Sequence, residues 1–216
     1  MMTLKTVYFS EFLQKNGQTL FNSYLFINFA GWTIWQSYVW IKAGTFGDIE
    51  ISFTVQSLVL TALVILRKPH QTVDTNIFNQ IIALIAFCSG AAFIGQPLTD
   101  PSMITDISKI IVLIANILGL ITLFNLGRSF GILIAFREVK SQGLYGWVRH
   151  PMYGTDILLR IGMTTSHFNT FTVSIFIIST GCYVYRALLE ERFLSQQPEY
   201  REYMQKVKYR FIRGIF

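Results

Sequence analysis

The sequence predicts an all-α membrane protein, a polytopic helical bundle that forms one domain over residues 1–216. Hydrophobic residues make up 52% of the chain and charged residues only 14%, whereas about a quarter of the residues in a soluble domain are charged. The apolar residues gather into long uncharged stretches, which is typical of membrane-spanning helices. In such a chain the formal net charge of +6 favours cytoplasmic loops and anionic headgroups, so we expect no nucleic-acid partner.

Four segments have the composition of membrane-spanning helices, which need roughly 20 apolar residues each. They are residues 16–41, 51–66, 77–95 and 107–126. The first carries no charge, and the fourth carries only Lys109, near its outer end. We therefore expect four spans before the motif-rich part of the chain.

The apolar region after residue 150 predicts a helical hairpin. Pro151 suits the first turn of a helix, where its missing N–H costs nothing. The arm that follows is short, and residues 166–169 form a break before the long apolar helix expected over 171–193. At about 1.5 Å per residue, the first arm is too short to cross the membrane comfortably. With the four spans, the hairpin brings the total to five or six membrane helices.

The distribution of Lys and Arg predicts the orientation. If the N-terminus is cytoplasmic, nearly all cations lie on the inner side, and only Lys42 and Lys109 lie outside. Both termini are therefore expected in the cytosol.

The tail, PEYREYMQKVKYRFIRGIF, alternates apolar and basic residues at helical spacing. The apolar positions are Tyr200, Tyr203, Met204, Val207 and Phe211. This pattern predicts a cytoplasmic amphipathic helix that lies on the membrane surface, or one that covers a cytoplasmic pocket as a lid.

The stretch QGLYGWVRHPMYGTD, residues 142–156, is the first candidate site. Proline restricts His150 to an extended backbone, so His150 lies at the start of the helix and Tyr153 about one turn further on. Free N–H groups at a helix start favour an anion, and Arg149 adds a planar fork for a carboxylate. The structural alternative is a basic loop that precedes a proline-started helix.

Glu190 and Glu191 are the second candidate. Two adjacent acids at the cytoplasmic end of a span are unusual, because the helix C-terminus and the headgroups both disfavour negative charge. They can provide the counter-charge for a bound cation. Alternatively, they form a solvated helix end that Arg186 and Arg192 balance.

Asp156 and Arg160 are the third candidate, because they lie four residues apart on one helix face inside the membrane arm. Ionisable side chains there are costly and usually serve function or join helices. Asn116 and Asn125 are expected to form hydrogen bonds between helices. The chain shows no zinc-ligand spacing, so no metal site is expected.

Together, these motifs resemble the membrane methyltransferases that include isoprenylcysteine carboxyl methyltransferase and the phospholipid N-methyltransferases. The family pattern is a G-x-Y-x-x-x-R-H-P-x-Y stretch, a helical hairpin, E-E-x-x-L and a Y-x-x-Y tail. The matching residues are Gly143, Tyr145, Arg149, His150, Pro151, Tyr153, Glu190, Glu191, Leu194, Tyr200 and Tyr203. The resemblance covers residues 126–216, which are therefore expected to carry the cofactor site.

The resemblance implies transfer of a methyl group from S-adenosyl-L-methionine to a lipid-like acceptor, a carboxylate or an amine, at the cytoplasmic face. It implies a cofactor site formed by Tyr145, Arg149, His150, Pro151, Tyr153, Glu190 and Glu191. The catalytic candidates are Asp156, Arg160 and Glu191. Arg160 could orient a carboxylate acceptor, and Asp156 or a glutamate could take a proton from an amine.

Two other functions remain open from the sequence. Some membrane sterol reductases carry a similar R-H-P-x-Y stretch and tail and use NADPH. These reductases tend to have Asn at the position of Met152 and an acidic residue soon after Tyr-x-Gly. Met at this position is found in many methyltransferases, whereas Asp156 keeps the reductase alternative open. The other alternative is a non-enzymatic membrane protein with a degenerate site, and the retained Arg-His-Pro-x-Tyr and Glu-Glu motifs disfavour it.

Overall fold

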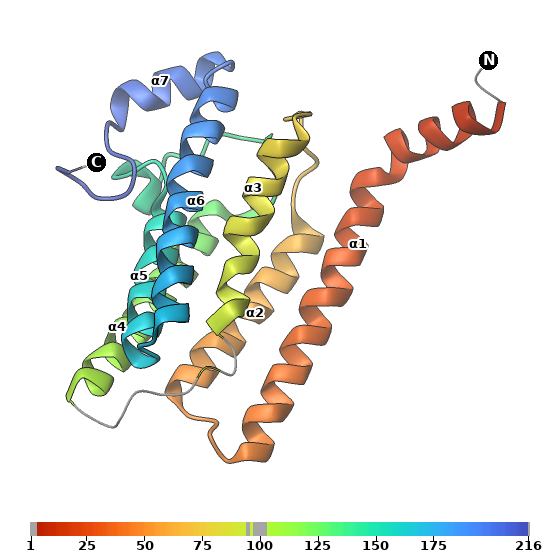
Figure 1. Ribbon diagram of the computed structural model, residues 1–216. Coiled ribbons are helices and arrows are strands. Elements are labelled where there is room, and N and C mark those ends of the chain that lie inside the picture. Colours follow the sequence, from red (N-terminus) through yellow and green to blue (C-terminus); the bar gives the residue numbers. More distant parts are fainter. Residues whose placement is uncertain (1–3, 94–95, 97–102, 216) are drawn as a thin grey trace.

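The computed structural model describes residues 4–93, 96 and 103–215, and these residues are mostly helical (Figure 1). The helices are α1 (Leu4–Ala43), α2 (Asp48–Leu66), α3 (Ile77–Cys88), α4 (Met103–Leu126), α5 (Pro151–Ser166), α6 (Thr170–Leu194) and α7 (Pro198–Lys206). Short 3-10 turns occur at η1 (Ser89–Phe93), η2 (Gly127–Ser129) and η3 (Gly143–Gly146). Two short strands, β1 (Thr72–Val73) and β2 (Ala135–Phe136), complete the described elements. The predicted all-α class is confirmed.

Three helical segments in the described residues are long and apolar enough to cross a membrane. They are Asp48–Leu66, Asp106–Ser129 and Thr170–Leu194. The expected first span lies within α1, whose apolar sequence is interrupted by polar residues such as Asn28 and Gln36. The expected third span is shorter than predicted, because α3 ends at Cys88 and continues only as the η1 turn. The second and fourth expected spans and the long arm of the hairpin therefore meet the length and composition of a span.

The hairpin forms where it was predicted. Pro151 occupies the first turn of α5, which ends at Ser166. Asn169 then caps α6, because its side chain accepts a hydrogen bond from the Thr172 N–H and its own N–H donates to the Thr172 hydroxyl. This reciprocal cap fixes the turn between the two arms.

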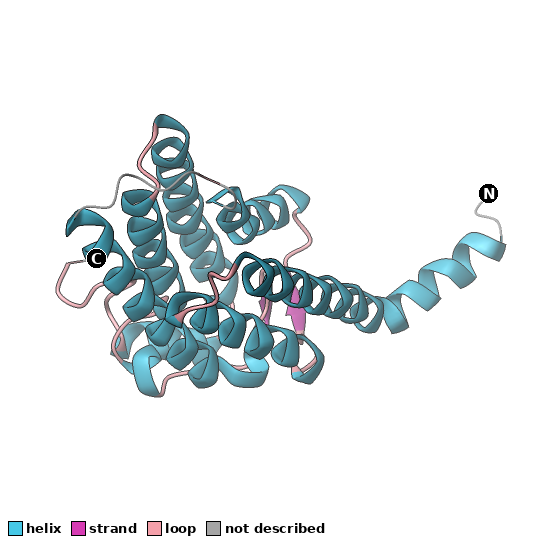
Figure 2. Cartoon of the chain, turned by 90° about the horizontal axis from the view of Figure 1, so that it is seen from below, coloured by secondary structure: helices cyan, strands magenta, loops and turns pink. Residues whose placement is uncertain are grey.

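Two loops from distant parts of the sequence join at the α7 end of the bundle. The strands β1 and β2 pair antiparallel, with Thr72 opposite Phe136 (Figure 2). The Gln80 side chain accepts from the Ile134 N–H at 2.9 Å and donates to its carbonyl at 3.1 Å. The loop that follows α4 is thereby fixed against α2 and α3, and it forms one wall of the cavity described below.

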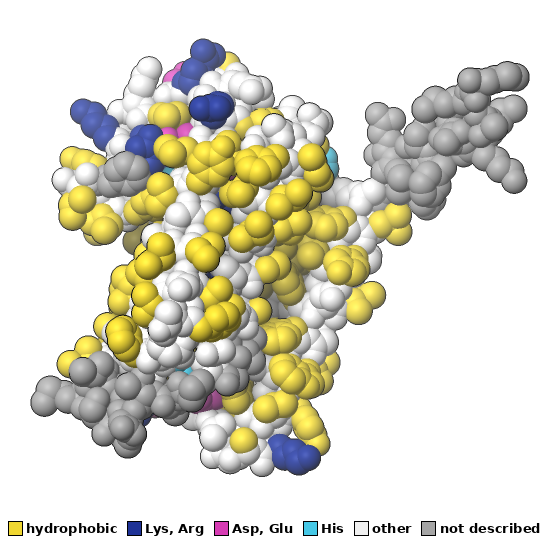
Figure 3. Space-filling model, viewed as in Figure 1, with side chains coloured by type: hydrophobic (Ala, Val, Ile, Leu, Met, Phe, Trp, Pro, Cys, Tyr) yellow, Lys and Arg dark blue, Asp and Glu magenta, His cyan; other side chains and the backbone are white. Residues whose placement is uncertain are grey.

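The surface of the bundle is apolar along its flank. Figure 3 shows hydrophobic side chains over the length of the helices, with Lys and Arg gathered around α7. Ile177 on α6 and Phe124 on α4 are 63% and 66% exposed, which is unfavourable in water and suits contact with lipid. The beginning of α1 and α7 lie at the same end of the bundle in Figure 1.

Candidate functional site

A cavity lies at the α7 end of the bundle, between α5, α6 and the loop that follows η2. Of the predicted site residues, it is lined by Tyr145, Arg149, His150, Tyr153, Asp156 and Glu190. Tyr200 and Tyr203 of α7 also line it. The lining extends to Tyr183, about three helical turns before the end of α6, so the cavity reaches into the bundle. The structure thus brings together residues from distant parts of the sequence, because the lining runs from Phe87 to Tyr203.

Glu191 lies beside the cavity and does not line it. Its Oε1 accepts from Arg149 Nε at 2.7 Å and is 3.2 Å from His150 Nε2. Its Oε2 accepts from Arg210 Nε at 3.0 Å. The residue is 5% exposed, and a buried carboxylate is tolerated only when it is paired in this way. Glu191 therefore holds Arg149 and His150 in place, and both of these residues line the cavity.

Glu190, in contrast, faces the cavity. Its Oε1 accepts from the Tyr153 hydroxyl at 2.6 Å and from Arg186 Nε at 3.0 Å. Its Oε2 lies 4.0 Å from His150 Nδ1, beyond hydrogen-bond distance. This oxygen keeps the capacity to accept a hydrogen bond from a cationic or hydroxyl group of a ligand.

Aromatic side chains surround this carboxylate. The Tyr153 ring stacks on His150, with centroids 5.3 Å apart and an angle of 9° between the planes. The Tyr203 hydroxyl donates to the Tyr145 carbonyl at 2.7 Å, which joins α7 to η3. Burial raises the pKa values of the Tyr145 and Tyr203 phenols above their ordinary range, so both are neutral at physiological pH. The wall therefore offers ring faces without competing negative charge.

A glycine turn places Tyr145 in this wall. Gly143 has a φ of +59°, which L side chains rarely adopt. A Cβ at this position would also lie 1.9 Å from Asn125 Oδ1, which accepts the Leu144 N–H at 2.9 Å. Asn125 therefore supports a loop and does not form the predicted hydrogen bond between helices.

The predicted hydrogen bond between helices is confirmed for Asn116, whose side chain on α4 donates to the Ser52 hydroxyl on α2 at 2.8 Å.

Asp156 and Arg160 form no salt bridge with each other in the described part of the chain, and each joins α5 to another element. Arg160 instead donates to the Asp156 main-chain carbonyl at 3.2 Å and to the Ser89 hydroxyl at 2.9 Å. The Asp156 carboxylate accepts from the Tyr183 hydroxyl at 2.9 Å, and both of these residues line the cavity. Arg160 does not line it, because its guanidinium turns toward η1 and joins α5 to that turn.

The tail covers the α7 end of the cavity and does not continue as a helix to Phe211. The prediction is wrong beyond Lys206, where α7 ends. The Arg149 and His150 N–H groups donate to the carbonyls of Tyr209 and Arg210, each at 2.8 Å. These main-chain bonds hold the segment extended beside the start of α5, so the lid arrangement fits the tail better than the surface helix.

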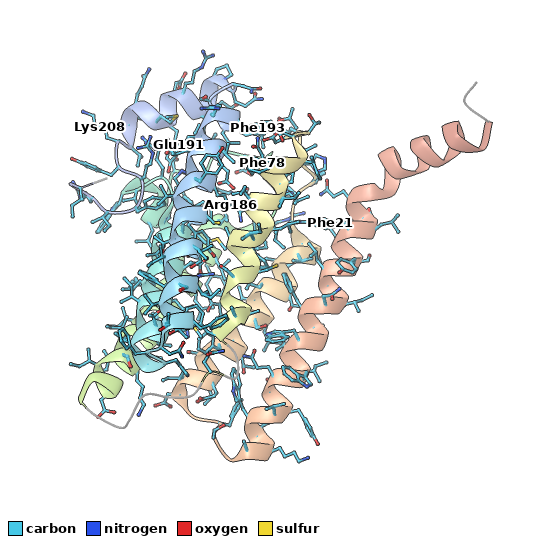
Figure 4. All side chains as sticks on the ribbon, viewed as in Figure 1. Phe21, Phe78, Arg186, Glu191, Phe193 and Lys208 are labelled. Atoms are coloured by element: carbon cyan, nitrogen blue, oxygen red, sulfur yellow. The ribbon has the colours of Figure 1, made fainter. Side chains whose placement is uncertain are left out.

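Two arginines in the lining were not among the predicted site residues. Arg186 donates from Nη1 to the Ala83 carbonyl at 3.0 Å and from Nη2 to the Ile132 carbonyl at 2.6 Å, and so links α6 to two other segments. Figure 4 shows Arg186 and Glu191 on α6, with Arg186 further from the α7 end. Its spacing of four residues from Glu190 was the available sequence signal. Arg137, in the loop after β2, carried no motif.

Pro151 does not line the cavity, and its contribution is to start α5 directly after His150. Neither Pro151 nor Glu191 thus lines this cavity, although both lie in the sequence motifs. Both hold neighbours that do line the cavity.

Comparison with known proteins yields one family. The model of the isoprenylcysteine carboxyl methyltransferase (ICMT) family matches residues 108–196. No curated protein gives a significant match. The matched segment runs from α4 to just beyond α6 and includes the Arg-His-Pro-x-Tyr stretch and the glutamate pair. The resemblance inferred from the motifs is therefore confirmed: from α4 to the end of α6, this chain is similar to the isoprenylcysteine carboxyl methyltransferase (ICMT) family of membrane methyltransferases.

Proposed function

We propose that the chain transfers a methyl group from S-adenosyl-L-methionine to a lipid-like acceptor in the membrane. The observation that carries the proposal is the Glu190 carboxylate, which faces a cavity with tyrosine walls and has one oxygen free of hydrogen bonds to the described residues. The match to the ICMT family supports a methyltransferase over the reductase alternative.

The lining fits the chemical groups of this cofactor. When bound, S-adenosylmethionine supplies a methyl group that its sulfonium charge makes electrophilic. Glu190 can bind the ammonium group or a ribose hydroxyl, because its Oε2 accepts without losing the bond from Tyr153. The faces of Tyr145, Tyr200 and Tyr203 suit an adenine ring or a nearby cation. His150 lies in the same wall, held in place by Glu191.

The deep part of the cavity suits the acceptor. Asp156 and Tyr183 are the polar groups there, and both belong to the arms of the hairpin. An amine acceptor must lose a proton, and Asp156 is the base nearest to this part of the cavity. A carboxylate acceptor is already a nucleophile and needs only alignment with the methyl group, which can provide a large share of the rate enhancement. Arg160 does not line the cavity, and its guanidinium lies 4.7 Å from the centroid of the Tyr183 ring, so we assign it the role of positioning Tyr183.

We further propose that the α7 end of the bundle, and with it the cavity, faces the cytosol. The excess of Lys and Arg near α7 supports this orientation. A water-soluble cofactor would then enter from the cytosol, and a lipid-like acceptor would reach the deep end from the bilayer.

Thermal unfolding in the presence of candidate cofactors tests the proposal. S-adenosylhomocysteine should raise the Tm of the protein in lipid nanodiscs, because a ligand that binds only the folded state stabilises it. Glu190→Gln should lose most of this increase, and Glu202→Gln, which replaces an exposed acid on α7, should retain it. Stabilisation by NADPH alone would establish the reductase alternative. Stabilisation by neither compound would support the non-enzymatic alternative.

A further inference from the structure

The cations that line the cavity differ in how their charge is balanced. Three of them have a carboxylate within 3.0 Å, and the pairs are Arg149 with Glu191, Arg186 with Glu190 and Lys140 with Glu138. Hydrogen bonds from Lys140 and Lys68 lower the pKa of Glu138 to about 2, so this carboxylate is ionised at physiological pH. It balances the charge of both lysines. These charges are already neutralised within the protein.

Arg137 is the exception among the cations of this lining in the described residues. It is 8% exposed, and no described carboxylate lies within 4 Å of its guanidinium. Its Nε donates to the Lys68 carbonyl at 3.0 Å, but neither terminal nitrogen has a hydrogen-bond partner in the described part of the chain. Burying a guanidinium without a counter-anion is unfavourable, because the charge loses its hydration and no ion pair replaces it.

The surroundings of Arg137 hold this guanidinium at the cavity wall. A Cβ on Gly131 would lie 2.5 Å from Arg137 Nη1, so the absence of a side chain there gives the guanidinium its space. Gly131 lines the same cavity. The main chain of Arg137 is fixed as well, because Gln71 Nε2 donates to its carbonyl at 2.8 Å. The guanidinium is therefore held in place beside the cavity.

We propose that Arg137 binds a carboxylate group of a ligand in the cavity through its two terminal nitrogens. The planar fork of an arginine matches the two oxygens of a carboxylate. The inference rests on the proposed function, which supplies two sources of this group: the amino-acid carboxylate of the methyl donor and a carboxylate on the acceptor. Arg149, the sequence-based candidate for this role, already donates from Nη1 to the carbonyls of Val207 and Lys208 and from Nε to Glu191.

The test compares Arg137→Gln with a matched control, Arg128→Gln. Both arginines donate from Nε to a main-chain carbonyl near the end of α2: Arg128 to Leu66, the last residue of the helix, and Arg137 to Lys68, two residues further on. Arg128 is exposed and does not line the cavity. Loss of the main-chain bond is thus common to both variants, and loss of the cavity cation is specific to Arg137→Gln.

Calorimetry in nanodiscs measures the affinity for S-adenosylhomocysteine and for its decarboxylated analogue. If the methyl donor supplies the carboxylate, Arg137→Gln weakens S-adenosylhomocysteine binding by about tenfold or more. The analogue should bind the wild-type protein and this variant equally, which also shows that the cavity is still folded. Arg128→Gln should bind both compounds like the wild type.

If the acceptor supplies the carboxylate, Arg137→Gln retains S-adenosylhomocysteine affinity. It then shows a raised KM for the lipid that becomes a base-labile methyl ester. Unchanged affinity together with an unchanged KM would overturn the inference. A wild-type protein that neither binds S-adenosylhomocysteine nor methylates lipid would instead overturn the proposed function, and the inference with it.

Discussion

Glu190 and Glu191 are adjacent on α6, yet their carboxylates have different surroundings. Successive residues on an α-helix point about 100° apart, so one of the two faces the cavity and the other faces the start of α5 and the tail. Glu190 retains an oxygen for a ligand, and Glu191 balances Arg149 and Arg210. In the function proposed above, the paired-glutamate motif thus combines one residue that binds the cofactor with one that positions its neighbours.

Gly143 provides a test of the geometry at the level of a single residue. Gly143→Ala should destabilise the protein and displace Tyr145, because the new Cβ would overlap Asn125 Oδ1 in a backbone conformation that alanine disfavours. We expect a loss of roughly 2 kcal/mol or more in the free energy of unfolding. Thermal unfolding and S-adenosylhomocysteine affinity check this expectation.

Gly181→Ala is the matched control for this substitution. Gly181 lies in the middle of α6, where an added Cβ would meet nothing within 4 Å, and alanine favours a helix over glycine by about 1 kcal/mol. It should be neutral or stabilising. Equal stability of the two alanine variants would refute the geometry assigned to the η3 turn.

Several site residues could be predicted from the sequence because the motifs lie at the ends of helices. Pro151 marks the start of α5, and this fixes His150 and Tyr153 on neighbouring positions of one wall. The role of Arg137 could not be predicted, because its burial depends on a loop held by Gln80 and on a glycine six residues earlier. The partners of Asp156 and Arg160 could not be predicted, because helix spacing alone does not reveal the acceptors of η1 or the Tyr183 hydroxyl of α6.

Among the elements, the tail makes contacts that its sequence pattern does not reveal. Its apolar spacing predicts one helix, but the chain leaves the helix at Lys206 because the start of α5 offers main-chain donors. The extended segment that follows gives Arg149 two carbonyl acceptors and gives Glu191 the Arg210 guanidinium. By contrast, the hairpin of α5 and α6 was predictable, because a proline and a polar break mark its ends.

Truncation tests whether the tail organises the cavity. Deleting residues 207–216 should weaken S-adenosylhomocysteine binding by about tenfold or more, because Arg149 and His150 lose the groups that position them. Deleting only residues 212–216 preserves those contacts and should change the affinity little. Calorimetry on the two truncated proteins makes the comparison. Equal affinities would contradict the role assigned to residues 207–211.

At the scale of the whole molecule, the cavity extends from the loops at the α7 end into the apolar bundle. Cationic side chains gather around that end, and the flank toward the other end is apolar (Figure 3). This distribution supports a molecule that lies across the bilayer with the cavity near one face. The number of spans was less predictable, because α1 mixes polar and aromatic residues and α3 is short.

Cysteine labelling from one side of the membrane tests the orientation. In a background where Cys88 and Cys182 are replaced by alanine, Lys42→Cys should react with a membrane-impermeant maleimide on intact cells. Glu199→Cys, on α7, should react only after the membrane is permeabilised. The reverse pattern would place the cavity on the outer face and contradict the proposed orientation.

Methyl transfer itself is the most direct test of the central claim. Purified protein in nanodiscs is incubated with methyl-labelled S-adenosylmethionine and a total lipid extract, and the label in the organic phase is counted. The wild type and Glu202→Gln should transfer label to lipid, and Glu190→Gln should lose at least about 99% of that activity, because it removes the cavity-facing charge. The account would be contradicted if Glu190→Gln and the wild type transferred equal amounts of label to the organic phase. It would also be contradicted if neither protein transferred any label.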